Sequence, residues 1–109
     1  MEHEVIVIGG GSAGYAAART AATAGAEVAI VDQGPLGGLC ILRGCMPSKT
    51  VLASAEALHR ARQAPDLGLL IPRAEADLPA IIARKRRLVA EFAEQRIDQI
   101  MHAPNSTLL

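Results

Sequence analysis

The sequence contains 109 residues, the length of one small domain. Eleven basic and eleven acidic residues give a formal net charge of zero, which argues against a general binder of nucleic acids or anionic membranes. No apolar run is long enough to span a bilayer, and the acidic residues 1–4 are unlike a secretory signal, so we expect a cytoplasmic protein. Half of the residues are hydrophobic but only 2% are aromatic, which predicts an aliphatic, alanine-rich core.

The first third of the chain predicts a β-α-β unit. Val5–Ile8 is a run of β-branched residues, typical of a strand that a parallel sheet buries on both faces. Residues 15–24 are mostly alanine and predict a helix, with Gly25 at the position that ends it. Residues 27–32 predict a second strand. This order implies a right-handed crossover and a parallel strand pair.

The middle of the chain predicts a loop followed by a helix. Residues 33–44 hold five glycines or prolines and predict an irregular loop. Proline is favoured in the first turn of a helix, so a helix is expected to begin at Met46 or Pro47. This helix is expected to run to about Gln63, before Pro65 ends it.

The last third of the chain predicts a connection and one long helix. Residues 66–76 form the connection, which we expect to be extended near its middle, around residues 69–71. Asp77 is the expected N-cap, and the helix continues to about Met101 with one apolar stripe. At roughly 1.5 Å per residue it would be about 35 Å long, and would project beyond a small domain. Residues 107–109 resemble the start of a strand.

Three glycines lie between the first predicted strand and the first predicted helix. Gly9, Gly11 and Gly14 fit the pattern G-x-G-x-x-G, in which the glycines allow a tight turn, close approach of a pyrophosphate and helix–strand contact. Asp32 lies 18 residues after Gly14, near the spacing of about 20 expected for an acid that binds ribose hydroxyls. The alternative is an ordinary turn and a solvated aspartate. The turn does not distinguish FAD from NAD(P).

Two cysteines follow, Cys40 and Cys45. Cα atoms five residues apart on an ideal helix are roughly 8–9 Å from each other, whereas a disulfide requires less than about 7 Å. Bridging therefore needs a distorted backbone, which Gly44 permits. The helix start at Pro47 would stabilise a thiolate at Cys45, and Lys49 adds positive charge. A redox pair is favoured over two buried free cysteines or a metal site, because the scattered histidines complete no zinc set.

Residues 37–49 (GGLCILRGCMPSK) resemble the active-site signature of the class I pyridine nucleotide–disulfide oxidoreductases, such as dihydrolipoamide dehydrogenase, glutathione reductase and mercuric reductase. The resemblance covers about residues 5–49 and implies an α/β fold. It predicts a Rossmann-like FAD-binding βαβ unit with a parallel sheet, followed by two helices. Residues 1–109 would be the N-terminal part of an FAD-binding domain, without the NAD(P)-binding and dimerisation domains.

The resemblance also implies a role for each site residue. Cys45 would be the thiol next to the flavin, with a charge-transfer contact when reduced, and Cys40 would meet the substrate disulfide. Lys49 would lie near the flavin N5 edge and tune it. Electrons would pass from NAD(P)H to FAD, to the Cys40–Cys45 disulfide and to a small-molecule or protein-bound disulfide, or in reverse. The residues expected to hold FAD, besides Lys49, are Gly9, Gly11, Gly14, Asp32 and Gly38.

The resemblance further implies a full-length enzyme that is a homodimer, whereas this stretch alone is expected to be inactive and to bind FAD poorly. Three residues depart from the family pattern: Leu39 replaces threonine, Leu42 replaces asparagine and Asp32 replaces glutamate. The Pro-Ser-Lys ending leans toward the lipoamide and mercuric branches. Two alternatives remain open. One is a flavin or NAD(P) oxidoreductase with incidental cysteines, and the other is a non-enzymatic nucleotide-binding or redox-sensing module.

A basic run, residues 84–87, lies on the long predicted helix. Its simplest interpretation is a solvated face that Glu91 and Glu94 balance. The alternative is a patch that binds a nucleic acid or another anion.

Overall fold

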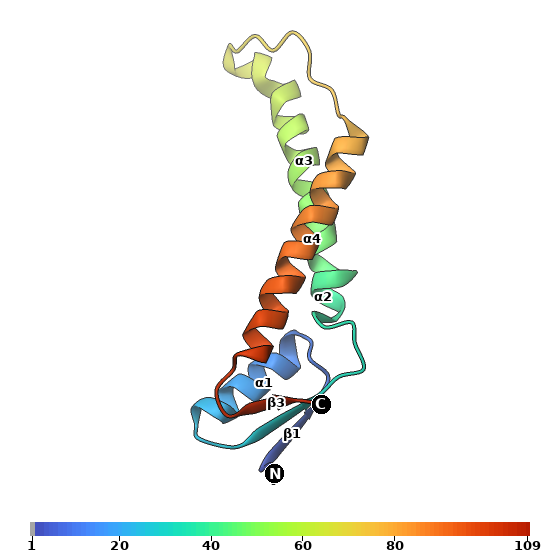
Figure 1. Cartoon of the computed structure of the whole chain (residues 1–109). Helices are drawn as coiled ribbons and strands as arrows, with labels where there is room; N and C mark the ends of the chain where they lie inside the picture. The colour runs from blue at the N-terminus through green and yellow to red at the C-terminus, as the bar shows by residue number, and fades with distance from the viewer. Residues whose placement is uncertain (1) are drawn as a thin grey trace.

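The computed structural model describes residues 2–109, which form a small parallel sheet with a long helical hairpin extending from it (Figure 1). The molecule measures 65 × 26 × 18 Å. In chain order its elements are β1 (Val5–Ile8), α1 (Ser12–Thr23), β2 (Val28–Val31), α2 (Gly38–Leu42), α3 (Cys45–Gln63), the 3₁₀ helix η1 (Ala64–Leu67), α4 (Leu78–Met101) and β3 (Ser106–Leu108).

The three strands are parallel and lie in the order β1-β2-β3. The predicted β-α-β unit is therefore present, and the chain returns through the hairpin to add β3 beside β2. Helix α1 begins at Ser12, three residues before the predicted start, because Gly11 is already the N-cap and Gly14 is tolerated inside the first turn. Gly25 has a φ of +96° just after α1, as its predicted role in ending the helix requires.

The core lies between α1, one face of the sheet and the last turn of α4. The predicted aliphatic, alanine-rich composition is confirmed by the buried cluster of Ala18, Ala22, Val28, Ile30 and Ile100. The prediction that β1 is buried on both faces is wrong within this chain. Ile6 and Ile8 are 64% and 87% exposed, because α1 and α4 cover only the opposite face of the sheet.

The loop predicted over residues 33–44 is wrong over its second half, which forms the short helix α2. Gly37 and Gly38 have positive φ angles and turn the chain, after which the apolar residues that follow form a helical turn that buries Ile41. Helix α3 begins at Cys45, close to the predicted start. It ends at Gln63, as predicted, and is followed by η1, in which Pro65 occupies an N-terminal position.

Helix α4 matches the predicted long helix closely. The Asp77 carboxylate accepts a hydrogen bond from the Ala80 N–H at 3.0 Å, which confirms the predicted N-cap. The connection between η1 and α4 contains no strand, so the extended segment expected at residues 69–71 pairs with nothing. Within residues 2–109, neither long helix is apolar over a stretch that would cross a bilayer.

Candidate functional site

The glycine turn joins β1 to α1 and is held by its own backbone. The Gly9 N–H donates to the Val31 carbonyl at 2.7 Å, which ties the turn to the end of β2. A Cβ atom on Gly14 would lie 1.8 Å from the Gly9 carbonyl oxygen, so no other residue fits there without moving the turn. No side chain caps the start of α1, and its first turn contains no acidic residue. The amides of this turn are therefore suited to an anionic ligand.

Asp32, at the end of β2, fastens this turn from the other side. Its carboxylate accepts hydrogen bonds from the Gly10 N–H at 2.5 Å and from the Gly34 N–H at 2.6 Å. The sequence predicted a ribose-binding acid, and the structure adds this structural role, which the pattern did not indicate. A carboxylate has about four acceptor positions, so the two bonds leave room for further donors.

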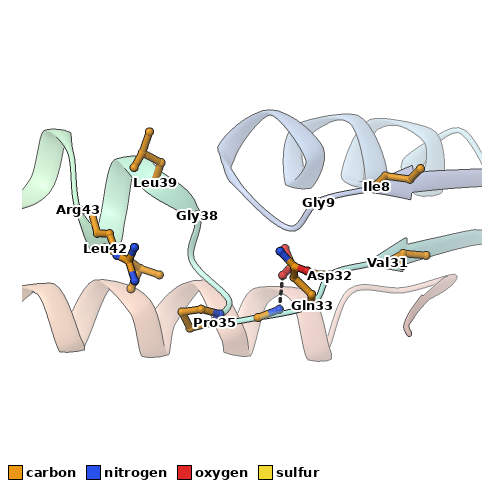
Figure 2. Close-up of a pocket in the computed structure, with 11 residues that line it drawn as sticks. Ile8, Gly9, Val31, Asp32, Gln33, Pro35, Gly38, Leu39, Leu42 and Arg43 are labelled. Carbon is orange, nitrogen blue, oxygen red and sulfur yellow. Dashed lines mark hydrogen bonds between the residues drawn. The ribbon is translucent and has the colours of Figure 1, made fainter.

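A cavity of about 710 Å³ opens between the ends of β1 and β2 and the start of α2 (Figure 2). Gly9, Asp32 and Gly38 line it, as predicted for three of the cofactor residues. Gly11 lies directly behind Gly38, since a Cβ on Gly38 would be 2.6 Å from the Gly11 Cα atom. This contact explains why two small residues are needed where α2 meets the glycine turn. The structure thus brings the predicted glycines and Asp32 together.

The other residues that line this cavity are mostly apolar. Two of them, Leu42 and Arg43, had not been predicted to belong to the site. Leu42 and Arg43 lie at the α2 end of the cavity, across from Asp32 (Figure 2). Leu39 also lines it and is 75% exposed, where relatives of the predicted family carry threonine. The sequence signal for Arg43 was its position between the two cysteines.

The two cysteines lie at the break between α2 and α3. Cys40 is in α2 and Cys45 is the first residue of α3, with Gly44 between them at φ −124° and ψ −109°. A Cβ on Gly44 would lie 3.0 Å from the Leu39 carbonyl oxygen. The predicted backbone distortion at Gly44 is therefore present. Both thiols are free in this structure.

The two cysteines are neighbours across the Gly44 break, and the Cys45 side chain raises the pKa of Cys40 above its ordinary value. Desolvation and the charge of Cys45 act in the same direction on this pKa, whereas the positive charge of Lys49 lowers it. Lys49 lies one helical turn after Cys45 and is exposed. The structure thus groups Cys40, Cys45 and Lys49, and this group lies outside the residues that line the cavity.

Fold and geometry define a Rossmann-type α/β protein that carries two neighbouring thiols shortly after its glycine-rich turn. Residues 3–105 match the family model described as pyridine nucleotide-disulphide oxidoreductase. The chain therefore belongs to the pyridine nucleotide–disulphide oxidoreductase family. The family consists of enzymes that use FAD and NAD(P)H.

Individual relatives agree with this assignment. The chain is 34% identical over 107 residues to a mercuric reductase of Lysinibacillus sphaericus, covering 98% of this chain and 20% of that protein. It is 44% identical over 91 residues to a dihydrolipoyl dehydrogenase of Chlamydia muridarum, covering 84% of this chain and 20% of the relative. Its fold matches the HOCl-induced flavoprotein disulfide reductase RclA from Escherichia coli, with a TM-score of 0.72 and 29% identity, over 98% of this chain and 21% of that one. The chain thus spans about a fifth of the length of these proteins.

Proposed function

We propose that the protein acts as an FAD-dependent oxidoreductase that passes electrons between NAD(P)H and a substrate through flavin and a Cys40–Cys45 disulfide, most like dihydrolipoamide dehydrogenase. The observation that carries this proposal is the placement of the two free thiols next to each other across the break between α2 and α3. Two cysteines that merely fill space need neither a mutual contact nor the unusual backbone at Gly44.

The residues around the cavity fit the ADP portion of FAD. The amides of the first turn of α1, which follow Gly11, face no capping side chain and suit the pyrophosphate, and Asp32 retains acceptor positions for ribose hydroxyls. Gly14 and Gly38 keep the turn, α1 and α2 in close contact. When bound, FAD would supply a group that accepts and donates an electron pair.

The thiol pair would store that electron pair in a sulfur–sulfur bond. Reduction of the disulfide takes up two electrons and two protons and yields the thiols of Cys40 and Cys45. The raised pKa of Cys40 favours its protonated form. Lys49, beside the pair, would stabilise the negative charge. Cys40 would then attack the substrate once its proton is removed.

The substrate class follows from the same pair. A dithiol that alternates with a disulfide exchanges electrons with another disulfide or with a soft metal ion through its thiolates. We propose a small-molecule or protein-bound disulfide as substrate, and a cytoplasmic homodimer as the full-length protein. The Pro47–Ser48–Lys49 ending of the signature favours the lipoamide and mercuric branches. The chain resembles both a mercuric reductase and a dihydrolipoyl dehydrogenase, so its relatives support both branches. The choice of substrate is therefore part of the proposal.

An anaerobic spectral titration of the full-length protein with dithionite tests the proposal. We expect bound flavin and, after two-electron reduction, a long-wavelength absorption band that is lost in a Cys45→Ser variant. The matched control is Cys40→Ser, which keeps the Cys45 thiol but cannot form the disulfide, and is expected to show such a band before any reductant is added. Flavin that bleaches without any band would mean that the cysteines are bystanders. A protein that never binds flavin would refute the oxidoreductase and leave a nucleotide-binding module.

A further inference from the structure

The basic run of α4, residues 84–87, is only half balanced by neighbouring groups. Arg84 Nη1 donates to the Thr50 carbonyl at 3.0 Å, and Arg87 forms an ion pair with Glu91 at 2.8 Å. Lys85 and Arg86 form no ion pair with any group of residues 2–109. The interpretation of the run as a face balanced by glutamates therefore holds for Arg87 alone.

The two unpaired cations lie on one side of a groove between α4 and the break that joins α2 to α3. Lys85 and Arg86 line this groove from α4, and Arg43 lines it from the end of α2. Val89 and Ala93 follow at helical spacing, and together with Pro47 they give it an apolar floor. The groove has a volume of about 490 Å³, and no acidic residue lines it.

This arrangement suits an anionic ligand. Like charges around one groove repel one another, and no acidic side chain lines the groove to balance them. A bound anion would reduce this repulsion. Two guanidinium groups can each form paired hydrogen bonds with a phosphate or a carboxylate, and the apolar floor accepts a hydrocarbon group. The volume lies within the range of about 300–1,000 Å³ that is typical of small-molecule sites.

We propose that the groove of Arg43, Lys85 and Arg86 binds a small molecule that carries a phosphate or carboxylate on an apolar stem. This inference goes beyond the proposed oxidoreductase and does not require flavin. A nucleic acid is disfavoured, because Arg84 and Arg87 are engaged elsewhere and the remaining cations surround a groove and do not form an extended track.

The test is a calorimetric titration of the full-length protein with phenyl phosphate, which joins the two features in one probe. We expect a Lys85→Gln/Arg86→Gln variant to bind it about tenfold more weakly or worse, since two charged donors to the anion are lost. Arg87→Gln is the matched control, a neighbour in the same run, and is expected to change the affinity less than about twofold. An Arg43→Gln variant, outside α4, repeats the test from the other wall.

Three outcomes would overturn the proposal. The first is that phenyl phosphate gives no heat of binding at concentrations up to roughly 10 mM, because a dissociation constant above that value is too weak for a specific site. The second is equal weakening by Arg87→Gln, which would indicate general charge attraction. The third is a single-stranded oligonucleotide that binds more tightly than phenyl phosphate and is equally sensitive to all the variants. Comparison with phenylacetate, which is expected to bind in the same groove, identifies whether phosphate or carboxylate is preferred.

Discussion

At the sheet end of the molecule, formed by the three strands and α1, short elements enclose a continuous core of small aliphatic side chains. Ala18, Val28 and Ile30 are each at most 1% exposed there. In the helical hairpin, formed by α3 and α4, much longer helices bury far less. Thr50 is the buried residue of α3, and Ile100, buried in α4, packs into the sheet core.

The difference shows that a longer helix does not necessarily bury more of its side chains. The hairpin leaves Leu52 and Met101 more than half exposed, at 63% and 59%, so its helices rely on their intrinsic propensity and on a few local contacts. The sheet end depends instead on close approach of backbones at glycines and alanines. Substitutions of similar chemistry should therefore cost much more at the sheet end than in the hairpin.

The largest effect is expected for Gly14→Ala in the glycine turn. The added Cβ would lie 1.8 Å from the Gly9 carbonyl oxygen, so α1 must move away from β1. We expect a loss of about 4 kcal/mol or more in the free energy of unfolding, measured by denaturant titration. Gly68→Ala is the control in the hairpin, where space is open and only the φ of +76° is strained. It should cost about 1 kcal/mol. Equal losses would contradict the comparison.

The next largest loss in the free energy of unfolding is expected within α4, because its last two turns are buried to different extents. Ile100 is 2% exposed in the sheet core, whereas Ile97, one turn earlier, is 37% exposed. Ile100→Ala should lower the free energy of unfolding by about 3 kcal/mol, because it leaves a cavity. Ile97→Ala should lower it by about 1 kcal/mol or less, in the same denaturation experiment. A larger loss for Ile97 would mean that the hairpin is packed as tightly as the sheet.

A smaller effect is expected for the bond that joins the two hairpin helices. Arg84→Gln removes the hydrogen bond from the Arg84 guanidinium to the carbonyl of Thr50, which is a buried residue of α3. We expect a loss of about 1 kcal/mol, at the low end for a charged donor because the Arg84 side chain is exposed. The comparison variant is Arg87→Gln, which breaks only an exposed ion pair and should change stability by less than about 0.5 kcal/mol. Hydrogen exchange in α3 would locate the loss.

The sequence predicted well wherever a local rule decides the structure. The β-branched run of β1, the alanines of α1 and the Asp77 cap each depend on neighbours a few residues away. The bounds of β1 and the cap were placed correctly, and α1 begins only three residues before its predicted start. The paired thiols of Cys40 and Cys45 were also expected, together with the distortion at Gly44. Their catalytic roles, and the FAD contacts, stay predictions.

What the sequence did not reveal depends on contacts between distant segments. The hydrogen bond from the Gly10 N–H to the Asp32 carboxylate joins residues 22 apart, and nothing in the motif distinguishes a carboxylate that fixes a turn from one that binds a ribose. Helix α2 was not predicted because its glycines suggest a loop. In the structure these glycines instead let the start of α2 pack closely against Gly11. The exposed face of β1 was missed because burial of a strand depends on what covers it, not on its own residues.

The smallest effect is expected for the pKa of Cys40, which lies between the sheet end and the helical hairpin. The Cys45 side chain raises the Cys40 pKa, so folding favours the protonated thiol. Its contribution to stability is complete below the pKa of the unfolded chain and is lost as the pH rises through the higher pKa of the folded protein. Alkylation of Cys40 by iodoacetamide, followed by peptide mass spectrometry, should therefore show a lower midpoint pH in Cys45→Ser than in the wild type. Lys49→Gln should shift the midpoint upward, since the lysine lowers this pKa. Unchanged midpoints in both variants would mean that the thiols do not interact, and the dithiol proposal would lose its main support.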